Sequence, residues 1–71
     1  MKKNEFLNEL SIIFEKKINE KTGLDQLNFD SLKVLELISL KESKFKKLKI
    51  NPDQYLKCRS ISEILKLFKI S

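Results

Sequence analysis

The stretch that decides the fold runs Leu27-Asn28-Phe29-Asp30-Ser31-Leu32-Lys33-Val34-Leu35-Glu36-Leu37-Ile38. Polar and apolar residues are mixed up to residue 30, and from residue 32 onward Leu, Val and Ile recur at spacings of three and four, which is the helical period. Ser31 therefore lies at the start of a helix, where backbone N–H groups lack intrahelical partners and the dipole is positive. A phosphate esterified to this hydroxyl would lie where anions are favoured.

The composition is typical of one small helical domain. The chain has 71 residues, of which 41% are hydrophobic and 35% are charged. Helix formers such as Leu, Lys, Glu and Ile dominate. The chain has a single Gly and a single Pro, so we expect its turns to be few and short. We expect an all-α fold with one domain over residues 1–71.

The apolar spacing and the capping residues predict four helices, at about residues 2–20, 31–46, 52–57 and 61–70. Gly23 follows the first helix as the expected stop. Asn51 and Pro52 suit the N-cap and first position of the short third helix. Ser60 and Glu63 form a capping-box pattern for the last helix.

Two apolar faces are expected to build the core. The stripe of the first helix comprises Phe6, Leu7, Leu10, Ile13, Phe14 and Ile18. In the second helix, the residues expected to face the core are Leu35, Ile38 and Phe45. Further apolar residues, Leu32, Val34 and Leu37, widen the arc beyond what a core stripe needs.

The run LNFDSLKVLELI resembles the phosphopantetheine attachment site of acyl carrier proteins and of their peptidyl and D-alanyl carrier relatives. Asp30-Ser31-Leu32 and Glu36-Leu37-Ile38 match the pattern of that family in identity and spacing. The resemblance covers nearly the whole chain, although the N-terminal third matches by pattern only. It implies a small acyl-carrier-protein-like bundle of three longer helices plus one short third helix.

The resemblance also implies a function. Ser31 would carry a 4′-phosphopantetheine arm, attached covalently from coenzyme A by a phosphopantetheinyl transferase, with Asp30 and Leu32 beside it. The arm would hold acyl or aminoacyl groups as thioesters and shuttle them between ligases or synthases, as in fatty acid biosynthesis and lipid metabolism. Partner enzymes would contact the residues that follow the serine, namely Leu32, Lys33, Leu35 and Glu36. For Leu35, contact with a partner and filling of the core are equally open.

The residues for intrinsic catalysis are missing from the sequence. There is no His, and the single Cys58 has no base beside it. Asp30 is the direct neighbour of Ser31 and is badly placed to take its proton, so a serine hydrolase mechanism has no basis. No Cys/His cluster suits zinc, and Gly23 alone makes no nucleotide loop. We therefore expect a non-catalytic carrier without a metal site.

The charge departs from the resemblance, because acyl carrier proteins are typically acidic. This chain has a net charge of +5, and five of its lysines lie between residues 41 and 49. One hypothesis is a specialised carrier with dedicated partners, distinct from the housekeeping carrier of fatty acid synthesis. The plain alternative is a lysine-rich face that is merely solvated.

Two other classes of function remain open. The basic segment could belong to a helical module that binds nucleic acid through phosphates. However, Arg59 is the single arginine and no helix-turn-helix pattern emerges, so no stable nucleic acid complex is expected. The second alternative is a helical adaptor that docks into a partner's groove, whose function would not depend on Ser31.

The expected location is the cytoplasm. The N-terminal Met1-Lys2-Lys3 is not followed by an unbroken apolar segment, so a signal peptide is not predicted. No apolar run approaches the length of a membrane span. The lone Cys58 fits a reducing compartment, and we expect a monomer.

Overall fold

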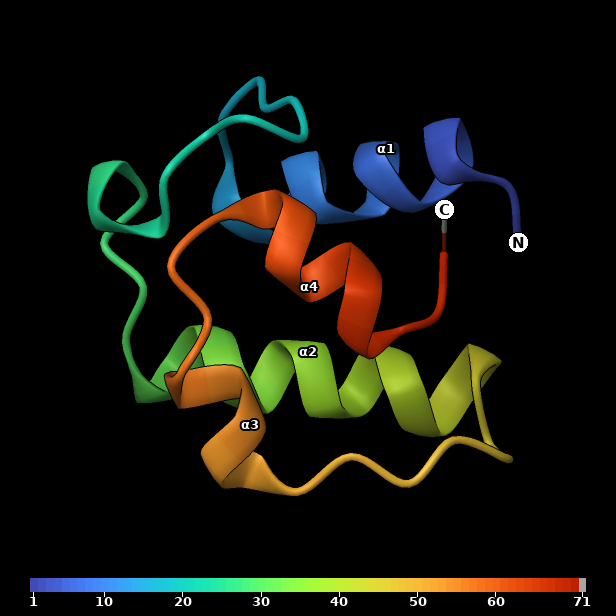
Figure 1. The fold of residues 1–71 in the computed structure, drawn as a ribbon. Coiled ribbons are helices and arrows are strands. Elements are labelled where there is room, and N and C mark those ends of the chain that lie inside the picture. Colours follow the sequence, from blue (N-terminus) through green and yellow to red (C-terminus); the bar gives the residue numbers. More distant parts are fainter. Residues whose placement is uncertain (71) are drawn as a thin grey trace.

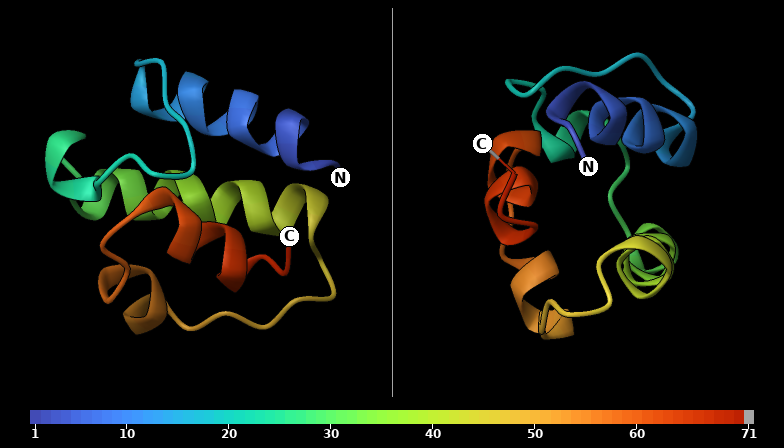
Figure 2. Two further views of the ribbon diagram at one scale, coloured as in Figure 1. Left: turned by 45° about the horizontal axis from the view of Figure 1, so that its top comes forward. Right: turned by 90° about the vertical axis from the view of Figure 1, so that its right-hand side faces the viewer.

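The computed structural model describes residues 1–70 as a small helical bundle. Its elements are α1 (Lys3–Phe14), the short 3-10 helix η1 (Leu24–Gln26), α2 (Ser31–Lys44), α3 (Pro52–Leu56) and α4 (Ile61–Leu67). The two long helices, α1 and α2, run in opposite directions and contact each other, α4 lies to one side of this pair (Figure 1 and Figure 2), and α3 packs against both α2 and α4. Residues 1–70 form no strand beyond one isolated bridge between Gly23 and Ser60. The expected all-α bundle with a short third helix is confirmed.

Phe68, at the end of α4, joins all four helices through aromatic contacts. Its ring centroid lies 4.8 Å from that of Phe6 in α1, 5.1 Å from Phe45 after α2 and 6.2 Å from Tyr55 in α3. Such pairs add about 0.5–1.5 kcal/mol each beyond the burial of their area. The helices surround this centre (Figure 2), and the buried core is wholly apolar apart from one tyrosine hydroxyl. Its members are Phe6, Leu10, Phe14, Leu24, Leu27, Val34, Leu37, Leu40, Tyr55, Ile61, Ile64, Leu65 and Phe68.

The first helix is shorter than its apolar stripe indicates. It was expected to reach residue 20, but it ends at Phe14 because Glu15 adopts the left-handed conformation, with φ 54° and ψ 38°. The N–H of Glu15 donates to the Ile12 carbonyl at 3.3 Å, and the N–H of Lys16 donates to the Ser11 carbonyl at 3.1 Å. These two bonds close the last turn and redirect the chain.

Gly23 is not the helix stop that the sequence analysis predicted. Its backbone is extended, with φ −78° and ψ 141°, and it pairs with Ser60 at the start of α4. Next to this bridge, the N–H of Leu24 donates to the Arg59 carbonyl at 2.9 Å, and the N–H of Ile61 donates to the Thr22 carbonyl at 3.0 Å. The pairing therefore holds η1 beside the segment that enters α4.

The core face of α2 is rotated from the expected one. The buried residues are Val34, Leu37 and Leu40, whereas Leu35 is 60% exposed, so the core role considered for Leu35 is wrong. The helix also ends at Lys44 and not at residue 46, since Phe45 leaves the helical conformation (φ −131°, ψ 48°). The ring of Phe45 then packs against Phe6 and Phe68 in the aromatic centre.

The starts of the last two helices follow the predicted capping patterns, although both helices end earlier than expected, at Leu56 and Leu67. The Gln54 side chain accepts from the N–H of Asn51 at 2.8 Å. The Glu63 carboxylate accepts from the N–H of Ser60 at 3.1 Å and also from the N–H of Arg59. Each bond satisfies a donor at a helix start.

The left-handed Glu15 allows a test of the helix end. We expect Glu15→Gly to raise the free energy of unfolding by about 0.5–1 kcal/mol, because glycine adopts this conformation without steric cost and removes a negative charge from the C-terminus of α1. Lys17→Gly, at a position without a positive φ, should lower it by about 0.5–1 kcal/mol. Urea unfolding measures both, and a loss of stability in Glu15→Gly would contradict this account of the helix end.

Candidate functional site

Ser31 is the first residue of α2 and is exposed to solvent. The preceding Asp30 is the N-cap, and its side chain accepts from the N–H of Lys33 at 3.1 Å. No hydrogen bond joins the Ser31 hydroxyl to the part of the chain that the structure describes. Since Asp30 caps the helix, the Ser31 hydroxyl is free for chemistry at the N-terminal, positive end of α2.

Lys33 ties the first turn of α2 to the last turn of α1. Its Nζ donates to the Ile13 carbonyl at 2.8 Å and lies 3.6 Å from a carboxylate oxygen of Glu36. The last turn of α1 has no basic residue of its own, so Lys33 supplies the positive charge that its free carbonyls favour. Sequence reasoning missed this role because the two partners are 20 positions apart. The bond fixes the helix that bears Ser31 relative to α1.

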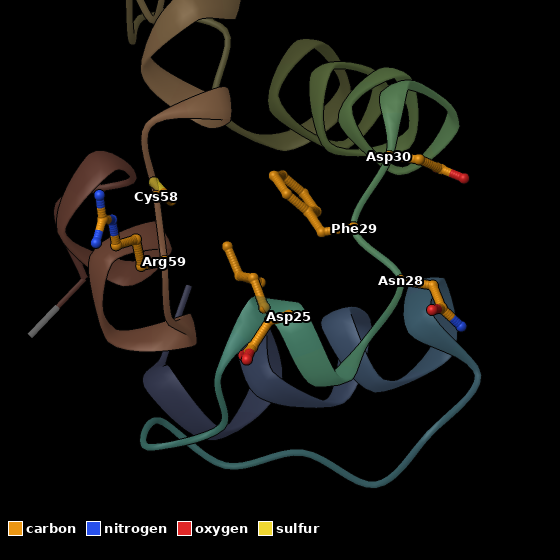
Figure 3. A pocket seen from close by; sticks show the side chains of 7 residues that line it. Asp25, Asn28, Phe29, Asp30, Cys58 and Arg59 are labelled. Carbon is orange, nitrogen blue, oxygen red and sulfur yellow. The ribbon is translucent and has the colours of Figure 1, made fainter.

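A hollow of about 770 Å³ lies beside Ser31, between η1 and the segment that joins α3 to α4. It is lined by Leu24, Asp25, Asn28, Phe29, Asp30, Cys58 and Arg59. The Phe29 ring points into the hollow toward Cys58, whereas the polar ends of Asn28, Asp30 and Arg59 point away from its centre (Figure 3). The hollow thus combines apolar side chains on its inner side with a polar rim next to the hydroxyl.

Cys58 and Tyr55 have structural surroundings. The half-buried Cys58 donates from Sγ to the Gln54 carbonyl at 3.4 Å, and burial together with the Glu63 charge raises the pKa of its thiol to about 11. Burial, with smaller effects from Glu42 and Cys58, also raises the pKa of Tyr55. The Tyr55 hydroxyl is buried without a hydrogen-bond partner among residues 1–70. Both side chains remain neutral near pH 7 and act in packing.

Two exposed leucines follow Ser31 on α2. Leu32 is 68% exposed and Leu35 is 60% exposed, and Glu36 lies on the same solvent-facing part of the helix. Leu56 of α3 is 61% exposed as well, a feature that the sequence pattern alone did not single out as part of the site. Exposed apolar side chains of this size are suited to contact with another protein.

Other kinds of site find no support in the described chain. Among residues 1–70, no group of three or more His, Cys, Asp or Glu side chains is placed to hold a metal ion. None of the helices in this range has both the length and the apolar composition needed to cross a membrane.

A protein-family model described as "Phosphopantetheine attachment site" matches residues 7–68. The match extends from the second turn of α1 to the end of α4 and includes Ser31 and the hollow beside it. No curated protein and no solved structure matches the chain.

The bond between Lys33 and Ile13 can be tested by removing the ammonium group. We expect Lys33→Met to lower the free energy of unfolding by about 1 kcal/mol, because the methylene stem is kept while the Ile13 carbonyl loses its donor. Lys47→Met, at an exposed position, should change it by less than about 0.5 kcal/mol. Thermal unfolding followed by circular dichroism compares the two, and equal effects would argue against a special role for Lys33.

The raised pKa of Cys58 predicts that its thiol is alkylated slowly in the folded chain. With a pKa of about 11 in place of 9.0, the thiolate fraction at pH 8 falls about a hundredfold. At pH 8 we expect iodoacetamide to alkylate Cys58 in the folded chain at least about tenfold more slowly than in urea, as measured by mass spectrometry, because the greater nucleophilicity of a more basic thiolate offsets part of its lower fraction. The rate in the folded chain should rise with pH up to about 11. A plateau near pH 9 would show that the thiol is not buried as described.

Proposed function

Since the chain belongs to the phosphopantetheine attachment-site family of carrier proteins, we propose that Ser31 carries its 4′-phosphopantetheine and that the protein is an acyl carrier. Members of this family bind 4′-phosphopantetheine covalently, work with a phosphopantetheinyl transferase and partner enzymes, and are generally non-catalytic. The observation that carries the proposal for Ser31 is its free, exposed hydroxyl at the start of α2, preceded by a residue that already caps the helix.

The residues around Ser31 fit the group. A phosphodiester there would lie close to the unpartnered N–H groups of the first turn, with the Lys33 charge two residues away. Leu32 extends from the same turn, and Asp30 connects Ser31 to the rim of the hollow. The apolar inner wall of Leu24, Phe29 and Cys58 could receive part of a flexible arm or its cargo.

Modification requires only a nucleophilic hydroxyl from this chain. Ser31 Oγ forms the new bond to a phosphorus of coenzyme A, the bond from that phosphorus to the nucleotide portion breaks, and the hydroxyl proton passes to a base of the transferase. Asp30 acts as the N-cap of α2, because its Oδ1 accepts from the N–H of Lys33. The attached group supplies a terminal thiol, which holds acyl or aminoacyl groups as thioesters.

Leu32, Leu35 and Glu36 form the proposed contact surface for partner enzymes. The two leucines bring exposed apolar area next to the reactive hydroxyl, and Glu36 brings a partly exposed carboxylate. Lys33 was expected to contact partners too. Because its Nζ is bonded to the Ile13 carbonyl, we propose that it acts mainly by positioning this surface.

We further propose a specialised carrier without catalysis of its own, acting as a monomeric domain in the cytoplasm. The net charge of +5 supports the specialised role, since it weakens docking to partners that recognise acidic carriers. The engaged Asp30 and the protonated Cys58 support the non-catalytic role. The free thiol of Cys58 agrees with a reducing compartment.

The proposal is tested by mass spectrometry of the intact protein after incubation with coenzyme A, Mg²⁺ and a broad-specificity phosphopantetheinyl transferase. We expect one phosphopantetheinyl group on the wild type and none on Ser31→Ala. The matched control is Ser39→Ala, an exposed serine of the same helix, which should be modified like the wild type.

Two results would overturn the assignment. Modification of Ser31→Ala would place the arm on another residue. A folded wild type that several transferases, including one from its own source, leave unmodified would remove the carrier function. In that case a helical adaptor would become the better interpretation, because its activity would not need Ser31.

A further inference from the structure

The two carboxylates of α2 are each matched by a lysine of the same helix. A carboxylate oxygen of Glu36 lies 3.6 Å from Lys33 Nζ, and one of Glu42 lies 3.2 Å from Lys41 Nζ. An approaching protein therefore meets these acidic groups with most of their charge compensated. α2 offers little net negative charge to a basic partner.

The basic end of α2, a name used for Lys44, the last residue of the helix, together with Lys46, Lys47 and Lys49 in the segment that follows it, is different. All four side chains are exposed, and none forms an ion pair within residues 1–70. Three of them, Lys44, Lys46 and Lys47, line a hollow of about 380 Å³ together with Phe45 and Leu48. The Phe45 ring is held by Phe6 and Phe68, so the floor of this hollow is anchored in the core.

We propose that the basic end of α2 docks onto a carboxylate-rich surface of the partner enzymes that act on Ser31, beginning with the phosphopantetheinyl transferase. The inference rests on the proposed carrier function. Ser31 and Lys44 are separated by 13 residues of helix, or about 20 Å along its axis. One enzyme face can span that length, with the exposed leucines beside its active site and the lysines against acidic residues farther out.

The features of this surface favour a protein over other anionic partners. The hollow combines apolar floor and cationic rim, which suits a carboxylate beside an apolar side chain. Nucleic acid binding usually relies on arginine and on longer basic stripes, whereas none of the four residues is an arginine. A membrane surface would need exposed apolar anchors among the lysines, but Phe45 and Leu48 are only partly exposed and the exposed leucines of α2 are near its other end.

The test compares Lys46→Glu/Lys47→Glu with Lys17→Glu/Lys21→Glu, which changes the net charge equally in the connector after α1. Lys44 is left intact because it supports the C-terminus of α2. The transferase of the protein's own source modifies each variant with coenzyme A and Mg²⁺ at several salt concentrations. We expect the first pair to raise the KM for the carrier about tenfold with little change in kcat, and the control pair to change neither. The wild-type KM should rise with salt, and this rise should be weaker in the first pair.

Other results would refute either the docking surface or the carrier function. If both pairs are modified with the wild-type KM, the docking surface is refuted while the carrier function stands. If no variant and no wild-type protein is modified, the carrier function itself fails. A 20-base-pair DNA duplex and vesicles containing phosphatidylserine are titrated in parallel. The proposal is overturned if the wild type binds the DNA or the vesicles at physiological salt, Lys46→Glu/Lys47→Glu abolishes that binding, and the variant keeps the wild-type KM for the transferase. The basic end of α2 would then be assigned to that ligand.

Discussion

The burial of the Phe68 ring is the constraint on which the bundle depends. α4 is short, and α3 shorter still, so neither could persist without tertiary contacts. One ring at the end of the last helix meets Phe6, Phe45 and Tyr55, which come from or directly follow the other three helices. The contact with Phe45 also requires α2 to stop, because its last helical residue must be followed by a turn into the core. The end of α2 thus coincides with the entry of Phe45 into the aromatic centre.

Helix content, helix order and the starts of the helices could be predicted from the sequence, because capping residues and apolar spacing act locally. The expected starts at Ser31, Pro52 and Ile61 agree with the structure for this reason. The end of α1 could not be predicted, because Glu15 adopts the left-handed conformation, which glutamate rarely does. The face of α2 was ambiguous because leucine, valine and isoleucine occur around most of the helix, and only packing against its neighbours decides that Leu37 is buried and Leu35 is not.

The candidate site also has one part that the sequence predicts and another that depends on tertiary packing. The place of Ser31 at a helix start follows from local pattern, and the family match across residues 7–68 agrees with the resemblance seen in that stretch. Its surroundings depend on distant parts of the chain. The Lys33 bond to Ile13 crosses between helices, and the hollow beside Ser31 needs Cys58 and Arg59 from the far side of the bundle. Periodicity cannot show contacts of this kind, because they form only once the helices have packed.

The N-cap formed by Asp30 would let Ser31 be modified without loss of the cap of α2. If Ser31 itself capped α2, converting its hydroxyl to an ester would remove a helix-stabilising bond and weaken the fold. Here the cap belongs to Asp30, and the Ser31 hydroxyl makes no bond within residues 1–70 that esterification would break. Esterification of Ser31 would therefore leave the cap of α2 intact. A phosphodiester on Ser31 would add negative charge at the positive end of α2 without removing a hydrogen bond of the bare chain.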